Sequence, residues 1–193
     1  METEKGTVPP PEAPPTAVAT TMDKKCRGID VILRVLLLAA SIVAIVVMVT
    51  SKQTATVLTP RGPIRAPAKF EHSPAFIYFV VALSVAGLYS IITAIASLSF
   101  FRKSSIPPKL FWILLVHDVL ILGIVAAATG AAGGVGYIGL KGNTHVKWMK
   151  ICNFYGKFCR HIGGSIFVSL FAAVVLVLLV VVNGYSLYCR IPE

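Results

Sequence analysis

The stretch FWILLVHDVLILG, residues 111–123, decides the fold because it places one carboxylate inside an otherwise apolar run. Asp118 is the only acidic residue between Glu71 and Glu193. An unpaired charge at the centre of a membrane-spanning helix costs about 2.5–3.5 kcal/mol on insertion scales. We therefore interpret Asp118 as a membrane-buried acid that has a partner of opposite charge elsewhere in the chain.

The composition of the chain is that of an integral membrane protein. Of the 193 residues, 56% are hydrophobic and 13% are charged, which is more apolar side chain than one soluble core of this length can cover. Several apolar runs have the length of about 20 residues that the hydrocarbon of a bilayer demands of a helix. A helix also satisfies its own backbone hydrogen bonds in lipid. The sequence predicts an all-α membrane protein, a four-transmembrane-helix bundle with spans at residues 29–49, 74–100, 110–130 and 162–187.

The segments outside the spans are rich in proline or in basic residues. Residues 1–28 carry five prolines among Glu, Thr and Ala, so we expect a disordered N-terminal tail. The net charge is +10, and most of the basic residues lie in the connecting segments. This distribution favours membrane lipids and wall polymers as neighbours and argues against a nucleic-acid partner. No cofactor is expected.

Cys152 and Cys159 share the loop between the third and fourth expected spans. Two cysteines in one short loop suit an oxidising exterior, where a disulfide persists, and we predict a Cys152–Cys159 disulfide. A zinc site is the alternative, because His145 and His161 flank the pair. The spacing C-x6-C is not that of a zinc knuckle, so no metal site is predicted.

Cys26 and Cys189 lie just beyond span ends, on the side of the two termini. Isolated cysteines beside a membrane suit a reducing cytosol, where they are either acylated or left as unmodified thiols. The basic residues on the two sides of the membrane do not settle the orientation. We therefore rely on the cysteines and predict that the N-terminal tail and the short C-terminus, residues 190–193, are cytosolic.

Two of the expected spans each carry an interior charge at similar depth. Arg34 lies about five residues into the first span and Asp118 about eight residues into the third, which differ by about one helical turn. We predict that Arg34 and Asp118 form a structural intramembrane ion pair, because pairing lowers the cost of burying both charges. Three alternatives stay open. Asp30, one turn before Arg34, could take the arginine; Arg34 could extend to the headgroups; and Asp118 could be protonated.

The third span continues into AAATGAAGGVG, residues 126–136. Gly130 and Gly134 form a GxxxG pattern, and Ala126 lies one turn earlier. Small residues on one face let helices approach closely in lipid. We predict that these three residues serve helix packing within the bundle, with a dimer seam as the alternative.

An arginine in the first span and an aspartate in the third, here Arg34 and Asp118, resemble the pattern of the Casparian strip membrane domain proteins and their CASP-like relatives in plants. The loop YIGLKGNTHVKWMKICNFYGKFC, residues 137–159, resembles the second outer loop of that family. The segments VTSKQT (49–54) and SPAFIYFVVA (73–82) resemble its group-one CASP-like branch. The first outer loop lacks the acidic, aromatic signature of the strip-forming members, so the resemblance is to a CASP-like protein.

This resemblance implies a MARVEL-like four-span membrane domain over residues 29–189. It also implies a non-enzymatic plasma-membrane scaffold. Such a protein oligomerises with itself or with other CASP-like proteins, organises a membrane domain and recruits secreted cell-wall-modifying enzymes.

The alternative function is a small four-span transporter or channel, which needs a polar path through the bundle. Ser84, Ser90, Thr93 and Ser97 form a sparse polar stripe on the second span. Hydroxyls of this kind can bond their own helix backbone, which weakens the interpretation. The spans contain no nucleophile–base pair, metal quartet or carboxylate dyad, so we do not expect an enzyme.

Overall fold

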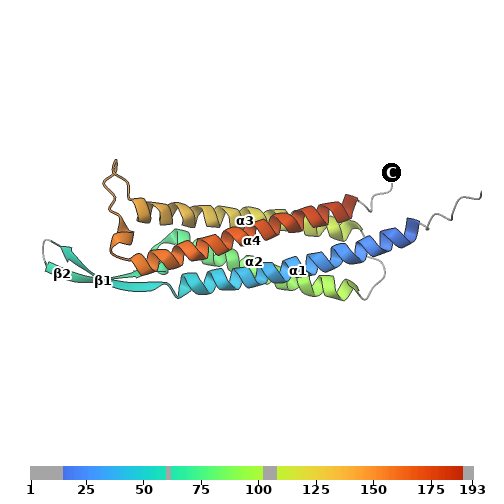
Figure 1. Cartoon of the computed structure of the whole chain (residues 1–193), viewed down its shortest axis with the longest axis horizontal. Helices are drawn as coiled ribbons and strands as arrows, with labels where there is room; N and C mark the ends of the chain where they lie inside the picture. Colours follow the sequence, from blue (N-terminus) through green and yellow to red (C-terminus); the bar gives the residue numbers. More distant parts are fainter. Residues whose placement is uncertain (1–14, 60–61, 102–107, 189–193) are drawn as a thin grey trace, which may run out of the picture.

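The computed structural model describes residues 15–59, 62–101 and 108–188. Within these residues, four long α-helices lie side by side, and each runs opposite to the one before it (Figure 1). They are α1 (Pro15–Val49), α2 (Pro74–Phe101), α3 (Pro108–Lys141) and α4 (Gly156–Tyr188). The start of α1 and the end of α4 therefore lie at the same end of the bundle, opposite the two longer connections.

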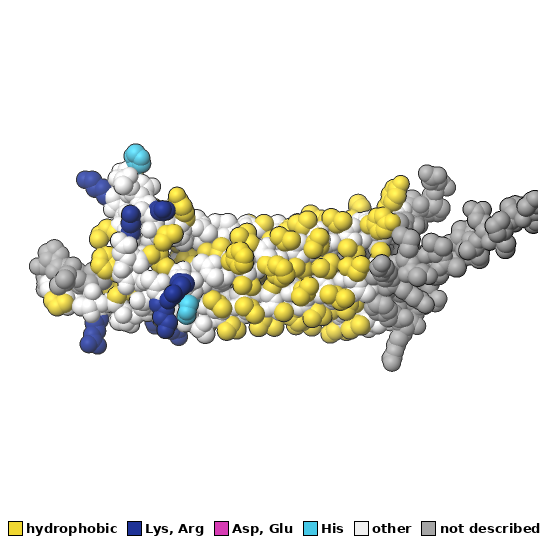
Figure 2. Space-filling model, viewed as in Figure 1, with side chains coloured by type: hydrophobic (Ala, Val, Ile, Leu, Met, Phe, Trp, Pro, Cys, Tyr) yellow, Lys and Arg dark blue, Asp and Glu magenta, His cyan; other side chains and the backbone are white. Residues whose placement is uncertain are grey.

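Each of these helices contains a segment long and apolar enough to cross a membrane. The segments are Gly28–Val49, Pro74–Ser99, Trp112–Lys141 and Gly156–Tyr188. Large apolar side chains also cover the outside of the bundle, where they form a broad belt (Figure 2). Lipid can solvate such a belt whereas water cannot. The predicted all-α, four-span membrane fold is confirmed.

The core between the helices combines large and small apolar side chains. Leu37, Phe79 and Leu179 are fully buried, and so are Ala44 and Ala86. Helix α1 packs against α2 and α4, and α3 packs against α4 and α2. The alternation of large and small side chains lets facing helices interdigitate and pack to the density of a protein interior.

The first helix begins earlier than the sequence predicted. The predicted disordered tail over residues 1–28 is wrong for residues 15–28, which are helical, while residues 1–14 lie outside the described part of the chain. Pro15 occupies the start of the helix, where its fixed φ and missing N–H suit the first turn. Alanine, methionine and lysine follow, which are all good helix formers.

The third and fourth helices are also longer than predicted. Helix α3 continues to Lys141 instead of ending at residue 130, and α4 begins at Gly156 instead of residue 162. Lipid offers the backbone no competing hydrogen-bond partners, so the glycine-rich end of α3 remains helical. In this part of α3, Gly136 faces Ile166 of α4, where a Cβ would lie in van der Waals contact at 3.4 Å from Cδ1.

A β-hairpin forms most of the connection between α1 and α2, which the sequence analysis did not predict. Its strands pair antiparallel over their full length: β1 (Lys52–Thr59) and β2 (Gly62–Lys69). The described residues also form two short 3-10 helices: η1 (Phe70–His72) and η2 (Ile151–Asn153).

Side chains and backbone join this hairpin to the first turns of α4. The backbone N–H of Phe158 donates to Oε1 of Gln53 at 2.9 Å, which satisfies a donor that the helix itself leaves free. The hydroxyl of Tyr155 donates to the carbonyl of Ala66 at 2.8 Å. The hairpin is therefore held against the bundle and does not stand alone.

Candidate functional site

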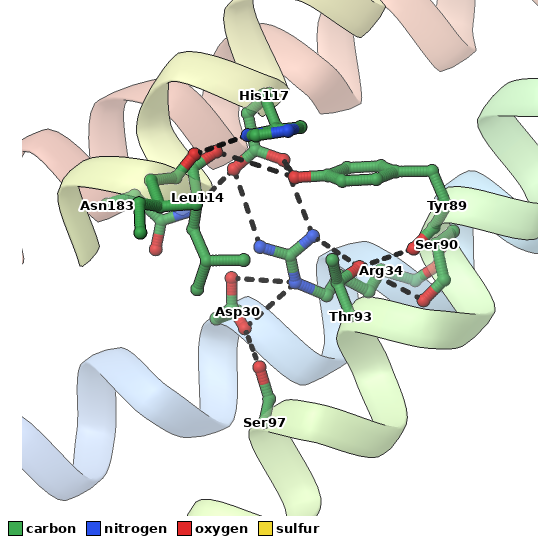
Figure 3. A network of polar contacts seen from close by, with 11 residues as sticks. Asp30, Arg34, Tyr89, Ser90, Thr93, Ser97, Leu114, His117 and Asn183 are labelled. Carbon is green, nitrogen blue, oxygen red and sulfur yellow. Dashed lines mark hydrogen bonds and ion pairs between the residues drawn. The ribbon is translucent and has the colours of Figure 1, made fainter. Parts of the chain in front are cut away.

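Arg34 of α1 and Asp118 of α3 face each other inside the bundle, and both are fully buried. Nη1 of the arginine lies 3.4 Å from Oδ1 of the aspartate, and Nη2 lies 3.4 Å from Oδ2 (Figure 3). The two planar groups meet in the paired arrangement typical of arginine and carboxylate. The structure thus brings together the two charges that the sequence analysis paired.

The guanidinium has a second carboxylate partner on its own helix. Nε of Arg34 lies 3.1 Å from both Oδ atoms of Asp30, one turn earlier in α1. Asp30 is itself buried. The local pair with Asp30 and the cross-helix pair with Asp118 therefore coexist. The burial of Arg34 is incompatible with the alternative that its side chain extends to the headgroups.

Asp118 receives two more hydrogen bonds, from α2 and α4. The hydroxyl of Tyr89 donates to Oδ1 at 2.7 Å, and Nδ2 of Asn183 donates to Oδ2 at 2.7 Å. Together with the two N–H groups of Arg34, four donors face one carboxyl group. Four donors are as many as the two oxygens of a carboxyl group can accept.

Hydroxyls of α2 fill the remaining sides of Arg34 and Asp30. Nη1 of Arg34 donates to Oγ1 of Thr93 at 2.8 Å, and the hydroxyl of Ser97 donates to Oδ2 of Asp30 at 2.9 Å. Ser90 donates to the backbone carbonyl of Arg34. Two of the four hydroxyls in the predicted polar stripe thus bind charged groups, and a third binds the backbone of Arg34. Ser84 is exposed and donates to the carbonyl of Val80 at 2.8 Å.

These contacts make one connected unit, which we call the four-helix cluster. Its members are Asp30, Arg34, Tyr89, Ser90, Thr93, Ser97, Asp118 and Asn183. Removing one member of a buried ion pair typically costs about 3–5 kcal/mol, because the other charge is left uncompensated. The cluster therefore has a structural role: it stabilises one rotation and one depth of each of the four helices relative to the others.

Two of the residues that bind Asp118, Tyr89 and Asn183, were not predicted from the sequence. Asn183 could have been identified from the sequence as a buried hydrogen-bonding residue, because it is the only asparagine or glutamine in any of the expected spans. Buried amides in lipid hydrogen-bond across helices. Tyr89 carried no such signal, since tyrosine is ordinary in a helix of this kind. Its ring lies 5.8 Å from the guanidinium carbon of Arg34, which adds a cation–π contact.

The structure pairs two of the four cysteines. Cys152 and Cys159 form a disulfide with their Cα atoms 5.7 Å apart. Cys26 is a free thiol in α1, two residues before the apolar segment begins at Gly28. Cys189, the other candidate for acylation, lies outside the described residues.

The predicted packing of Ala126, Gly130 and Gly134 within the bundle is wrong, because all three are exposed on the outside of α3. Val125, Ala128 and Ala132 face the core instead. The outward side of α3 carries a run of six small residues, the small-residue face: Gly123, Ala126, Ala127, Gly130, Ala131 and Gly134. A Cβ built on any of its three glycines would meet no atom within 4 Å. Both sides of α3 are apolar and rich in small residues, so composition alone did not reveal which one is packed.

The fold and the cluster define a class of protein: a four-span membrane protein with an arginine on its first span bound to an aspartate on its third. Residues 23–175 match the family model of the Casparian strip membrane protein domain. The chain belongs to this family, as the sequence resemblance predicted.

Curated relatives from plants agree with the family match. The chain is 71% identical over 193 residues to CASP-like protein Ni6 of Beta vulgaris subsp. maritima, covering 100% of this chain and 98% of the relative. It is 58% identical over 165 residues to CASP-like protein 1D2 of Glycine max, covering 85% of each. It is 52% identical over 192 residues to CASP-like protein 1D1 of Arabidopsis thaliana, covering 99% of this chain and 95% of the relative. No solved structure matches the chain.

Proposed function

We propose that this CASP-like membrane protein is a non-enzymatic scaffold of the plasma membrane. In this proposal, copies of the protein, or this protein and other CASP-like proteins, associate side by side through their helices and organise a membrane domain. The loops at the hairpin end then recruit secreted enzymes that modify the cell wall.

The observation that carries the proposal is the small-residue face of α3. Lipid tails are as apolar as leucine, so helices in a bilayer associate through close van der Waals packing, and this needs small residues. Gly130 and Gly134 leave the backbone of α3 open on a side where none of the described residues meets a Cβ built on either glycine. A helix of a second copy could approach the backbone of α3 closely there.

The four-helix cluster supports a scaffold over a channel. The hydroxyls of Ser90, Thr93 and Ser97, which would have to line a polar path, are engaged with Arg34 and Asp30. Among the described residues, Ser41 Oγ is the one buried side-chain polar atom that has no hydrogen-bond partner. A bundle joined in this way is a stiff body, and stiffness suits a repeating assembly.

The loops at the hairpin end support recruitment of partners outside the cell. They carry one acidic residue, Glu71, among many exposed basic ones, which Figure 2 shows gathered at that end. The described basic residues are Lys52, Arg65, Lys69, Lys141, Lys147, Lys150, Lys157 and Arg160. Such a surface attracts acidic enzymes and wall polymers. We assign this end to the exterior because the disulfide lies there, which leaves the termini in the cytosol.

The test of lateral association compares two leucine substitutions in the full-length protein. Gly130→Leu fills the small-residue face, whereas Ala39→Leu enlarges another exposed small residue on α1 and serves as the control. Native mass spectrometry in mild detergent should find more than one copy for wild type and for Ala39→Leu, and mainly one copy for Gly130→Leu. A wild-type protein that stays monomeric, or a Gly130→Leu variant with the wild-type copy number, would contradict the proposal.

A second readout tests the assembly in a membrane. Fluorescently tagged wild type should recover slowly after photobleaching in the plasma membrane of plant cells, because a large assembly diffuses slowly. Gly130→Leu should recover several times faster than Ala39→Leu. Equal recovery of all three proteins would count against an oligomeric platform.

A further inference from the structure

An apolar groove of about 330 Å³ lies between α3 and α4, near the end of the bundle that carries the hairpin. This volume is within the range of about 300–1,000 Å³ that is typical of ligand pockets. Phe158 and Ile162 are buried at its floor. Tyr137 and Leu140 line it with exposed side chains, so one side of the groove is open.

Glycines create the groove by leaving space where side chains would otherwise fill the helix interface. Gly133 on α3 and Gly163 on α4 both line it, and a Cβ built on either would meet no atom within 4 Å. The disulfide between Cys152 and Cys159 lines it as well. From Gly133 to Leu140 the groove follows α3 for about 10 Å at the helical rise of about 1.5 Å per residue.

Four basic residues are next in sequence to residues that line the part of the groove nearer the loops. Lys141 follows the lining residue Leu140, Lys150 precedes Ile151, Lys157 precedes Phe158 and Arg160 follows Cys159. All four of these basic residues are exposed. The loop that runs from residue 142 to 155 contains no acidic residue to neutralise them. The groove therefore combines an apolar trough with four exposed basic residues that adjoin its lining in sequence, which we call the positive rim.

We propose that this groove binds one membrane lipid whose phosphate headgroup carries a net negative charge. The acyl chain lies in the trough between α3 and α4, and the phosphate contacts the positive rim. The charge of the rim selects this occupant over a sterol or a neutral lipid. Most of the apolar lining lies within two membrane-spanning segments, and Lys141 and Lys157 lie at the ends of these segments, where a lipid headgroup would be. The proposal does not depend on the scaffold function.

The test uses the full-length protein in mild detergent, with phosphatidylglycerol and phosphatidylcholine of the same acyl chains as probes. Gly163→Leu fills the groove, and Gly164→Leu is its matched control, because Gly164 is also exposed and free of neighbours but does not line the groove. Both changes replace a helical glycine by a better helix former, so neither should prevent folding. Circular dichroism checks that the helical content is equal.

Native mass spectrometry should find one phosphatidylglycerol per copy of the chain on wild type and on Gly164→Leu, with at least fivefold less phosphatidylcholine. Gly163→Leu should retain at least fivefold less phosphatidylglycerol than Gly164→Leu. The double change Lys157→Ala with Arg160→Ala should reduce the preference for phosphatidylglycerol, whereas Lys69→Ala on the hairpin should not. Equal retention by the two glycine variants, equal retention of the two lipids by wild type, or preferential retention of a sterol would overturn the proposal. If Gly163→Leu, but not Gly164→Leu, loses a second copy of the chain that wild type binds, the groove is an interface between copies, and the proposal would also be overturned.

Discussion

Nδ2 of Asn183 lies 2.7 Å from Oδ2 of Asp118, so the last helix shares the carboxylate that the first helix binds through Arg34. Each of these side chains is almost completely buried. The contact explains why one acid on the third span can organise the whole bundle: α1, α2 and α4 each direct a donor toward it. Fixing the four helices in this way is the central physical claim about this protein.

Replacing Asn183 by leucine should destabilise the bundle although it makes the residue more apolar. A hydrogen bond to a charged group is worth about 1.5–3 kcal/mol, and the substitution removes this bond while Asp118 remains buried. Denaturant unfolding in mild detergent should show a loss of this size. Val181→Ala, an exposed position on the same helix, should change the free energy of unfolding by less than about 0.5 kcal/mol. Equal effects of the two changes would refute the role assigned to Asn183.

The Tyr89→Phe variant tests the hydroxyl separately from the ring. The ring over Arg34 stays, while the 2.7 Å hydrogen bond to Asp118 and a longer one, 3.4 Å, to the carbonyl of Leu114 are lost. We expect a loss of stability of about 1.5–3 kcal/mol. Tyr78→Phe is the matched control, because Tyr78 is an exposed residue of the same helix. If the two phenylalanine variants melt at the same temperature, the hydroxyl contributes nothing to the cluster.

Gly142 ends α3 in a conformation that disfavours any other residue. Its φ is +68°, and a Cβ would lie 2.7 Å from the backbone oxygen of Trp148. Gly142→Ala should therefore strain the loop by about 1–3 kcal/mol. Limited proteolysis with trypsin should cut faster after Lys147 and Lys150 in this variant. Gly156→Ala, where a Cβ meets nothing, should be cut at the wild-type rate. Unchanged cleavage of Gly142→Ala would show that the loop tolerates the change.

The proposed orientation predicts how Cys26 reacts in intact cells. Cys26 is a free thiol at the end of the bundle opposite the disulfide, so a membrane-impermeant maleimide should not label it. Permeabilised cells should show labelling, unless acylation blocks the thiol, in which case hydroxylamine treatment should restore it. A Cys26→Ser variant controls for other sites, including Cys189. Prompt labelling of Cys26 in intact cells would invert the topology.

The four spans could be predicted from the sequence because length and apolar composition are sufficient evidence for a helix in lipid. The contact between Arg34 and Asp118 could be predicted because two buried charges of opposite sign need each other. A buried hydrogen bond of Asn183 could have been predicted in the same way, since an amide in an apolar span also needs a partner.

Other features depend on information that a local pattern does not contain. Pro63 and Pro67 argue against a strand, yet β2 includes both, because a strand at the edge of a two-stranded sheet leaves some N–H positions unused. The outward direction of Gly130 could not be inferred, since in lipid neither side of α3 has to be polar. Helix α1 starts at Pro15, before its apolar segment. Hydrophobicity does not indicate a helix in these first residues, so the start could not be predicted from the apolar pattern.

The most direct test of the central claim is a double-mutant cycle on Arg34→Met and Asp118→Asn. The full-length single variants, the double variant and wild type are unfolded by denaturant in the same mild detergent. We predict that each single change destabilises the protein strongly and that the double change costs at least about 1 kcal/mol less than the sum of the two, as expected for residues in direct contact. Effects of the two changes that add to within about 0.5 kcal/mol would show that Arg34 and Asp118 do not stabilise each other, and would contradict the account.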